Sequence, residues 1–93
     1  MISYGKQTID KSDIDAINEV LKGDWLSSGP AVKTFEDDLN KYFGSKYACA
    51  VSNGTAALHL TGKALEWQSE DIVITSPVTF LATANSIVYA GAI

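Results

Sequence analysis

The chain has 93 residues, of which 46% are hydrophobic and 19% charged, a composition typical of a small globular domain and not of a disordered segment. Its formal net charge is −4, and it contains no arginine. Nucleic-acid binding normally requires clustered Lys or Arg side chains, whereas the seven basic residues stand singly among eleven acids. Charge therefore argues against a nucleic-acid partner.

Cysteine content and hydropathy bear on the cellular location. Cys49 is the only cysteine, so an internal disulfide is excluded, and the first residues lack an apolar signal-peptide core. Both features predict a cytoplasmic protein. No run approaches the roughly 20 apolar residues that span a bilayer. The apolar stretch 78–93 is interrupted by polar residues such as Thr79 and Asn85 and is interpreted as a buried helix.

Two amphipathic helices are predicted in the first half of the chain. Ser12 is expected to cap a helix over residues 13–22, and Gly23 is expected to end it in the left-handed conformation. Pro30 suits the first position of a second helix, which Gly44 ends.

Strands and helices alternate in the second half of the predicted order. Residues 47–51 and 72–75 are short apolar runs that suit strands buried on both faces. Packed helices are expected over residues 56–65 and 79–89, and a third strand is expected after Gly91. The order α, α, β, α, β, α predicts an α/β fold with a parallel sheet. Because two strands make a meagre sheet, the sequence is interpreted as cut off.

The junction of the first predicted strand with its helix is a candidate phosphate site. Residues 51–57 are mostly small, and a helix start presents unpaired N–H groups and the positive end of a dipole. The Thr55 hydroxyl could add one more hydrogen bond. The simpler alternative is an ordinary capped helix start, with Ser52 or Asn53 as the N-cap.

The segment 76–85 follows the second predicted strand, at the edge where open α/β sheets bind ligands. A planar ring could stack on Phe80, and Asn85 needs a polar partner if it is buried. The alternative is that Phe80 belongs to the core and Asn85 bonds a nearby loop. His59 is the only histidine and has no second metal ligand near it, so no metal site is predicted.

Taken in order, these segments resemble the DegT/DnrJ/EryC1/StrS family of pyridoxal-phosphate-dependent sugar aminotransferases. The resemblance covers essentially the whole chain but only about the first quarter of a family member, and it is strongest to the branch that acts in pseudaminic acid biosynthesis. The matching segments are 4–7, 13–22, 24–30, 35–36, 46–48, 51–60 and 76–91.

The resemblance implies a fold and a cofactor. Residues 1–93 would form an N-terminal arm and the incomplete start of the large domain of a fold type I (aspartate aminotransferase-like) transferase. In the parent protein, Gly54 and Thr55 would hold the phosphate of pyridoxal 5'-phosphate, Phe80 would stack on its pyridine ring, and Asn85 would lie on the same cofactor-side helix. The 93 residues alone are expected to bind the cofactor weakly or not at all.

The resemblance also implies a reaction, which transfers an amino group from glutamate to the C4 ketone of a UDP-linked deoxy sugar in a homodimeric enzyme. The residues expected in the nucleotide-sugar pocket are Tyr4, Leu26, Ser27 and Gly29. None of the seven lysines stands in the motif of the family's Schiff-base lysine, so no catalytic residue is assigned and the chain alone is expected to be inactive. The alternative is a small non-catalytic interaction module, a truncated gene product that associates with full-length subunits or with a phosphorylated ligand.

Overall fold

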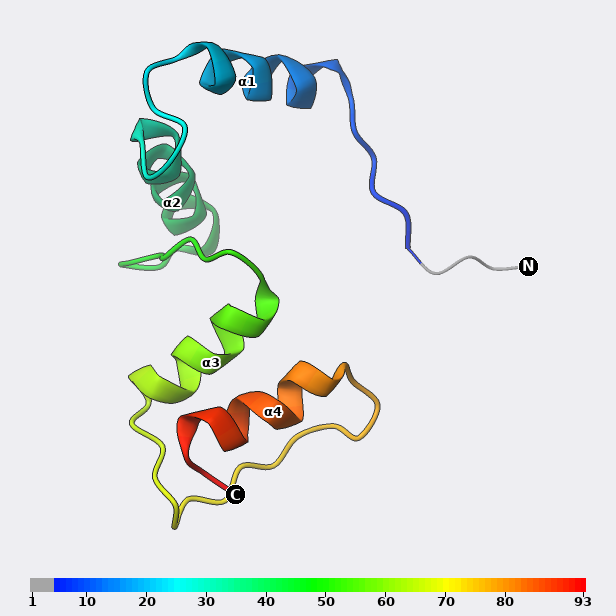
Figure 1. Cartoon of the computed structure of the whole chain (residues 1–93), viewed down its shortest axis with the longest axis vertical. Helices are drawn as coiled ribbons and strands as arrows, with labels where there is room; N and C mark the ends of the chain where they lie inside the picture. Colours follow the sequence, from blue (N-terminus) through cyan, green and yellow to red (C-terminus); the bar gives the residue numbers. More distant parts are fainter. Residues whose placement is uncertain (1–4) are drawn as a thin grey trace, which may run out of the picture. The chain divides into compact units, whose positions relative to one another are not determined.

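The structure is a computed structural model that describes residues 5–93. It divides into two units, the first ending at Ala50 and the second beginning at Val51, and each is described by itself. Within residues 5–93 the chain forms four helices and no strand (Figure 1). None of these helices has both the length and the apolar character needed to cross a bilayer.

Helix α1 (Lys11–Lys22) begins in the first unit with a reciprocal cap. The Asp10 carboxylate accepts hydrogen bonds from the amides of Ser12 (2.7 Å) and Asp13 (3.3 Å), and Asp13 accepts one from the Asp10 amide (2.9 Å). Gly23 ends α1 with an extended backbone (φ −79°, ψ 176°), so the left-handed conformation predicted for it is wrong. The prediction that Ser12 is the N-cap is also wrong. Its hydroxyl instead donates to Asp10, because a carboxylate accepts several hydrogen bonds at once where a hydroxyl offers fewer.

Acid is expected to weaken α1 through Asp10. Hydrogen bonds from the Ser12 hydroxyl, then from the Ser12 and Asp13 amides, hold the pKa of this carboxyl below its ordinary value of 3.8. A lowered folded pKa means that the stabilisation is complete above pH 3.8 and is lost as the pH falls through the folded value.

Amide chemical shifts of Ser12 and Asp13, followed during an acid titration, measure this effect. Asp10→Asn keeps a capping oxygen but has no charge to lose. In this variant the Ser12 and Asp13 amide shifts should therefore lack the step that protonation of Asp10 causes in the wild type. A wild-type midpoint at or above 3.8 would contradict the account.

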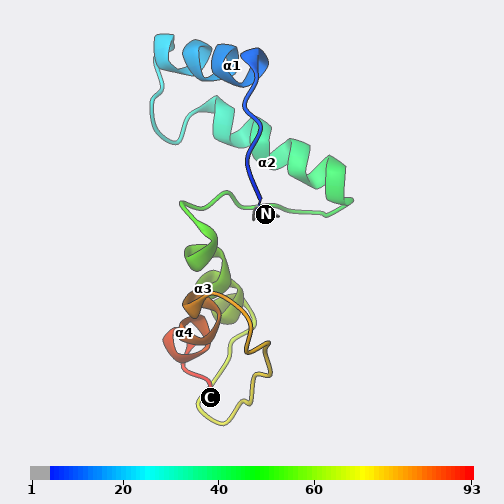
Figure 2. The same ribbon diagram turned by 90° about the vertical axis from the view of Figure 1, so that its right-hand side faces the viewer.

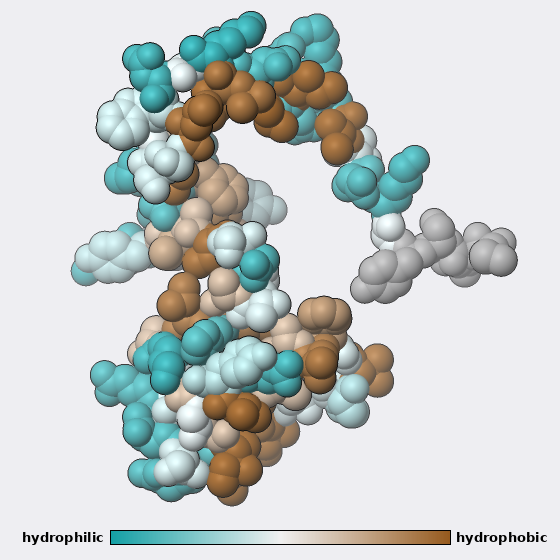
Figure 3. Space-filling model, viewed as in Figure 1, coloured by the Kyte–Doolittle hydropathy of each residue, from teal (hydrophilic) through white to brown (hydrophobic). Residues whose placement is uncertain are grey.

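Helix α2 (Pro30–Phe43) confirms the predicted start and end. Pro30 occupies the first turn, and Gly44 ends the helix in the left-handed conformation, at φ 63°. Neither α1 nor α2 buries a residue, and Ile17 and Phe35 are 59% and 56% exposed. Figure 3 shows hydrophobic side chains on the surface along α1. The first unit therefore has two amphipathic helices without a core of its own.

Helices α3 (Gly54–Ala64) and α4 (Leu81–Ala90) lie side by side in the second unit (Figures 1 and 2). The predicted start of α4 at residue 79 is wrong by two residues, because Phe80 has an extended backbone. Gly91 ends α4 at φ 107°, as predicted. The core of this unit lies between the two helices, and its buried members are Gly62, Ala82, Ser86, Ile87, Ala90 and Ala92.

Gly62 is the point of close approach between α3 and α4. A Cβ atom at this position would lie 2.7 Å from the Ala90 Cβ and 2.7 Å from the Trp67 ring. Trp67 is half-buried, and its amide donates to the Gly62 carbonyl at 3.2 Å. The indole therefore covers the place where a larger side chain would stand.

The second predicted strand, 72–75, is extended but is not a strand. The Ile93 amide donates to the Asp71 carbonyl (3.1 Å), and the Val73 amide donates to the Ile93 carbonyl (3.0 Å), which is the bonding pattern of a parallel pair. Ile74 is 93% exposed. A strand forms only with hydrogen bonds to a partner strand, and in residues 5–93 the backbone of this segment is hydrogen-bonded only to Ile93.

The first predicted strand, 47–51, is likewise not formed. The Ala50 amide donates to the Glu36 carboxylate of α2 at 2.8 Å instead of to a neighbouring strand. Cys49, expected to be buried in this strand, is exposed. The predicted α/β order is therefore not confirmed by residues 5–93, which are helical with extended connections.

Lys63 links α3 to the end of α4. Its Nζ donates to the Ala90 carbonyl at 3.1 Å, and α4 has no basic residue in its own last turn. Lys63→Met should lower the free energy of unfolding by about 1 kcal/mol, since it removes a hydrogen bond and a cation from a helix C-terminus. Lys63→Arg is the control that keeps the charge. Chemical denaturation measures both, and a Met variant as stable as wild type would contradict the role of this bond.

Candidate functional site

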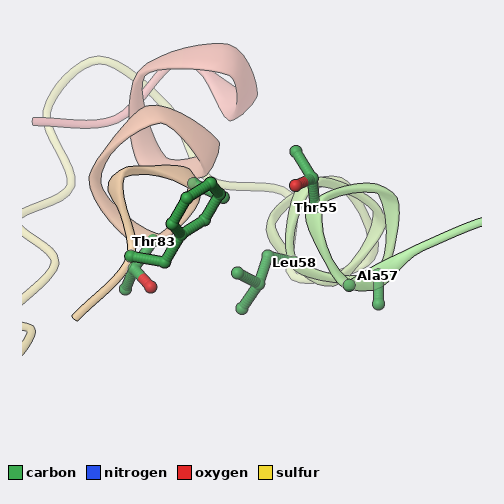
Figure 4. Close-up of a pocket in the computed structure, with 7 residues that line it drawn as sticks. Thr55, Ala57, Leu58 and Thr83 are labelled. Atoms are coloured by element: carbon green, nitrogen blue, oxygen red, sulfur yellow. The ribbon is translucent and has the colours of Figure 1, made fainter.

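A hollow of about 570 Å³ lies between the N-terminal parts of α3 and α4. In Figure 4, Thr55 and Leu58 come from α3 and Thr83 comes from α4. Its lining residues are Gly54, Thr55, Ala57, Leu58, Phe80, Ala82 and Thr83. The structure thus brings together three of the four predicted cofactor residues, Gly54, Thr55 and Phe80.

The start of α3 leaves two backbone amides free at this hollow. Asn53 is the N-cap, because its side-chain oxygen accepts from the Ala56 amide (2.9 Å) and its carbonyl from the Ala57 amide (3.1 Å). The amides of Gly54 and Thr55 have no hydrogen-bond partner within residues 5–93. A Cβ atom at Gly54 would meet nothing within 4 Å. Open space, free N–H groups and the positive end of the helix dipole fit a phosphate group.

Phe80 supplies an aromatic face to the same hollow. It stands immediately before α4 with φ −72° and ψ 148°, and it is 78% exposed. Within residues 5–93 Phe80 does not belong to the core. An exposed ring beside an apolar wall is a surface on which a planar ligand can stack. The residues present fit both parts of pyridoxal phosphate, its ring and its phosphate.

Asn85 does not line the hollow. It is half-buried on α4, two residues after Thr83, and two residues correspond to a rotation of about 200° around a helix. Asn85 therefore lies on the far side of α4 from Thr83. His59 is also absent from the lining. Its Nε2 is buried and has no hydrogen-bond partner among residues 5–93, and its ring meets the Tyr89 ring edge-on with 5.7 Å between the centroids.

The predicted nucleotide-sugar residues belong to the first unit or fall outside the description. Tyr4 lies outside the described residues. Leu26 is 71% exposed, Ser27 is exposed, and Gly29 is the half-buried N-cap of α2. A smaller hollow of about 220 Å³ lies beside the turn between α1 and α2, and none of these three residues lines it. The described residues do not gather them into a site.

Sequence reasoning missed Thr83 and Leu58 as lining residues. Thr83 stands three positions after Phe80, and this spacing places two residues on the same side of a helix. The spacing was a usable signal for Thr83. Leu58 likewise stands three positions after Thr55, but an apolar side chain at this place in the sequence suggests only core packing.

No group of three or more metal-binding side chains comes together in the part of the chain that the structure describes. The hollow likewise has no ionisable lining residue. Its lining offers backbone amides, two threonine hydroxyls and one aromatic ring.

Comparison with known proteins identifies the family. The model of the DegT/DnrJ/EryC1/StrS aminotransferase family matches residues 7–93. The chain belongs to this family. The resemblance found from its motifs is thereby confirmed.

Several curated relatives are similar over most of the chain. A UDP-4-amino-4,6-dideoxy-N-acetyl-beta-L-altrosamine transaminase of Campylobacter jejuni is 49% identical over 99% of the chain and 24% of its own length. The spore coat polysaccharide biosynthesis protein SpsC of Bacillus subtilis is 44% identical over 98% of the chain and 23% of its own length. The putative pyridoxal phosphate-dependent aminotransferase EpsN of the same species is 42% identical over 83% of the chain and 20% of its own length.

The chain thus spans about a quarter of the length of the curated relatives that it matches. No solved structure matches it.

Proposed function

We propose that this chain supplies the cofactor cradle of a pyridoxal-phosphate-dependent sugar aminotransferase, as the N-terminal quarter of such an enzyme. The observation that carries the proposal is the shared hollow of Gly54, Thr55 and Phe80. Two of these residues come from the start of α3 and the third from the loop before α4. The family match over residues 7–93 gives this hollow its expected ligand.

Each residue has a separate task in this cradle. The free amides of Gly54 and Thr55 donate hydrogen bonds to the phosphate, and the Thr55 hydroxyl adds a third donor. Phe80 offers its face to the pyridine ring and, with Leu58, excludes water from one side of it. When bound, the cofactor supplies the electron sink for amino transfer. Asn85 does not line the hollow and has no assigned task in this cradle.

The proposed substrates are glutamate and a UDP-linked sugar with a ketone at C4, in keeping with the transaminase name of the C. jejuni relative. Tyr4, Leu26, Ser27 and Gly29 stay predictions as sugar-nucleotide contacts, as do the homodimer and the cytoplasmic location. We also infer that residues 72–75 become a parallel strand of a fold type I domain. The two hydrogen bonds between residues 71–73 and Ile93 support this inference.

The chain alone is expected to carry out no amino transfer, because no lysine lines the hollow. A chimera tests the proposal. The part of this chain that aligns with the C. jejuni relative replaces the matching residues of that relative, which is 49% identical over 92 residues. Formation of 2-oxoglutarate from glutamate, with a UDP-linked 4-keto sugar as acceptor, is measured for the chimera, the relative and the isolated chain.

We expect turnover by the chimera and the relative and none by the isolated chain. An inactive but folded chimera beside an active relative would contradict the proposal. Turnover by the isolated chain would contradict the claim of inactivity. The exposed apolar faces of α1 and α2 favour a second candidate, a non-catalytic interaction module. That candidate predicts a cooperative thermal melt and a defined oligomer for the isolated chain.

A further inference from the structure

The loop that carries Phe80 is tied to α4 by two hydroxyl groups. The Oγ1 atoms of Thr79 and Thr83 lie 2.9 Å apart, and this hydrogen bond spans the first turn of α4. Phe80 lies between these two threonines in the sequence and is the N-cap of α4. Its carbonyl accepts a hydrogen bond from the Thr83 amide at 3.0 Å. The N-cap residue of α4 makes no side-chain hydrogen bond to the first turn of the helix. The hydroxyl pair is therefore the side-chain restraint on the backbone that presents the Phe80 ring.

Thr83 is well anchored for this task. Its carbonyl accepts a hydrogen bond from the Ser86 hydroxyl at 2.8 Å, and Ser86 is only 3% exposed in the contact between α3 and α4. Thr83 itself is half-buried and lines the hollow. The pair thus connects an exposed loop to the packed part of the second unit.

We propose that Thr83, through its hydrogen bond to Thr79, is a positioning residue that holds the Phe80 ring in the orientation on which a planar ligand stacks. The identity of that ligand rests on the proposed function. The phosphate is assigned to Gly54 and Thr55 on α3, which take no part in the hydroxyl pair. Ring and phosphate therefore have separate supports. Because Thr83 also lines the hollow and Thr79 does not, Thr79→Val is the variant that removes the hydrogen bond without changing the lining.

The test uses the 93-residue chain with two probes. Pyridoxine 5'-phosphate has the ring and the phosphate but no aldehyde to react with lysines, and inorganic phosphate has no ring. Thr83→Val and Thr79→Val keep the shape of the side chain and remove the hydrogen bond. Each should weaken pyridoxine 5'-phosphate binding about three- to fivefold, in line with the net worth of one hydrogen bond, and leave phosphate binding unchanged. Thr83→Ser should bind both probes as the wild type does.

A ligand-free measurement runs beside the titration. Three-bond couplings that report the χ1 angle of Phe80 should show one rotamer in the wild type and in Thr83→Ser, and averaged rotamers in Thr83→Val. Unchanged couplings in Thr83→Val would overturn the proposal. So would an equal loss of affinity for both probes, because that result indicates general loosening of the unit. If the wild type binds no pyridoxine 5'-phosphate, the cofactor proposal fails, while the couplings still decide the role of Thr83.

Discussion

Gly62→Ala is expected to destabilise the second unit by about 1–3 kcal/mol, although alanine normally favours a helix over glycine by up to ~1 kcal/mol. The added Cβ would stand 2.7 Å from the Ala90 Cβ and 2.7 Å from the Trp67 ring. Real Cβ atoms do not approach other carbons so closely, so α4 or the indole must move. Ala90 is 3% exposed and belongs to the core, which makes its displacement costly.

Gly54→Ala is the matched control in the same helix, because a Cβ there would meet nothing within 4 Å. It should unfold at the same denaturant concentration as the wild type or slightly higher. Trp67 fluorescence in a Trp25→Phe background reports the displacement of the indole by the Gly62→Ala substitution, since an indole that becomes more exposed emits at longer wavelength. A Gly62→Ala variant as stable as the Gly54→Ala control would show that α3 and α4 do not pack as described.

Phe80→Ala is expected to weaken binding of pyridoxine 5'-phosphate roughly five- to tenfold, because it removes the stacking surface and part of the apolar area against the ligand ring. Phe80 is 78% exposed, so its loss should leave the unfolding free energy nearly unchanged. Affinity for inorganic phosphate should also stay the same, since the amides of Gly54 and Thr55 are untouched. Isothermal titration calorimetry with both probes measures the difference.

Two controls make this result specific to Phe80. Phe80→Tyr keeps an aromatic face and should bind nearly as tightly as the wild type. Val78→Ala removes a side chain that is 90% exposed in the same loop but does not line the hollow, and it should have no effect. If Val78→Ala weakened binding as much as Phe80→Ala, the ligand would not be held by the Phe80 ring.

The helix boundaries could be predicted where local chemistry decides them. Pro30 and Gly44 bound α2, and Gly91 ends α4, because proline lacks an N–H group and glycine adopts positive φ readily. The cap of α1 was missed because Asp10 and Ser12 are both good caps in sequence. Only the structure shows that the carboxylate is the acceptor and the hydroxyl a donor.

The predicted features that the structure does not confirm are those that depend on distant partners. Residues 47–51 and 72–75 have the composition of strands, but backbone hydrogen bonds to a neighbouring strand decide whether a strand forms. Within residues 5–93 the second segment has such a neighbour only at Ile93. The α/β order therefore stays a prediction.

Only part of the candidate site could be predicted, because its assembly also depends on distant residues. Gly54, Thr55 and Phe80 each carried a local signal, a helix start or an aromatic residue after a strand-like run. Their meeting at one hollow depends on how α3 packs against α4 around Gly62, which no local pattern reveals. Asn85 was assigned by its helix alone, and the turn of that helix takes it away from Thr83.

We propose that the start of α3 and Phe80 together form a cradle for pyridoxal phosphate. A titration of the ¹⁵N-labelled chain with pyridoxine 5'-phosphate, followed by amide and aromatic chemical shifts, tests this proposal. We predict saturable shifts at the amides of Gly54 and Thr55 and at the Phe80 ring, all with one dissociation constant. Inorganic phosphate should shift the amide signals of Gly54 and Thr55 in the same way and leave the signals of the Phe80 ring unshifted. Shifts that never saturate, or that spread over the scattered lysines without affecting Gly54 and Thr55, would contradict the claim.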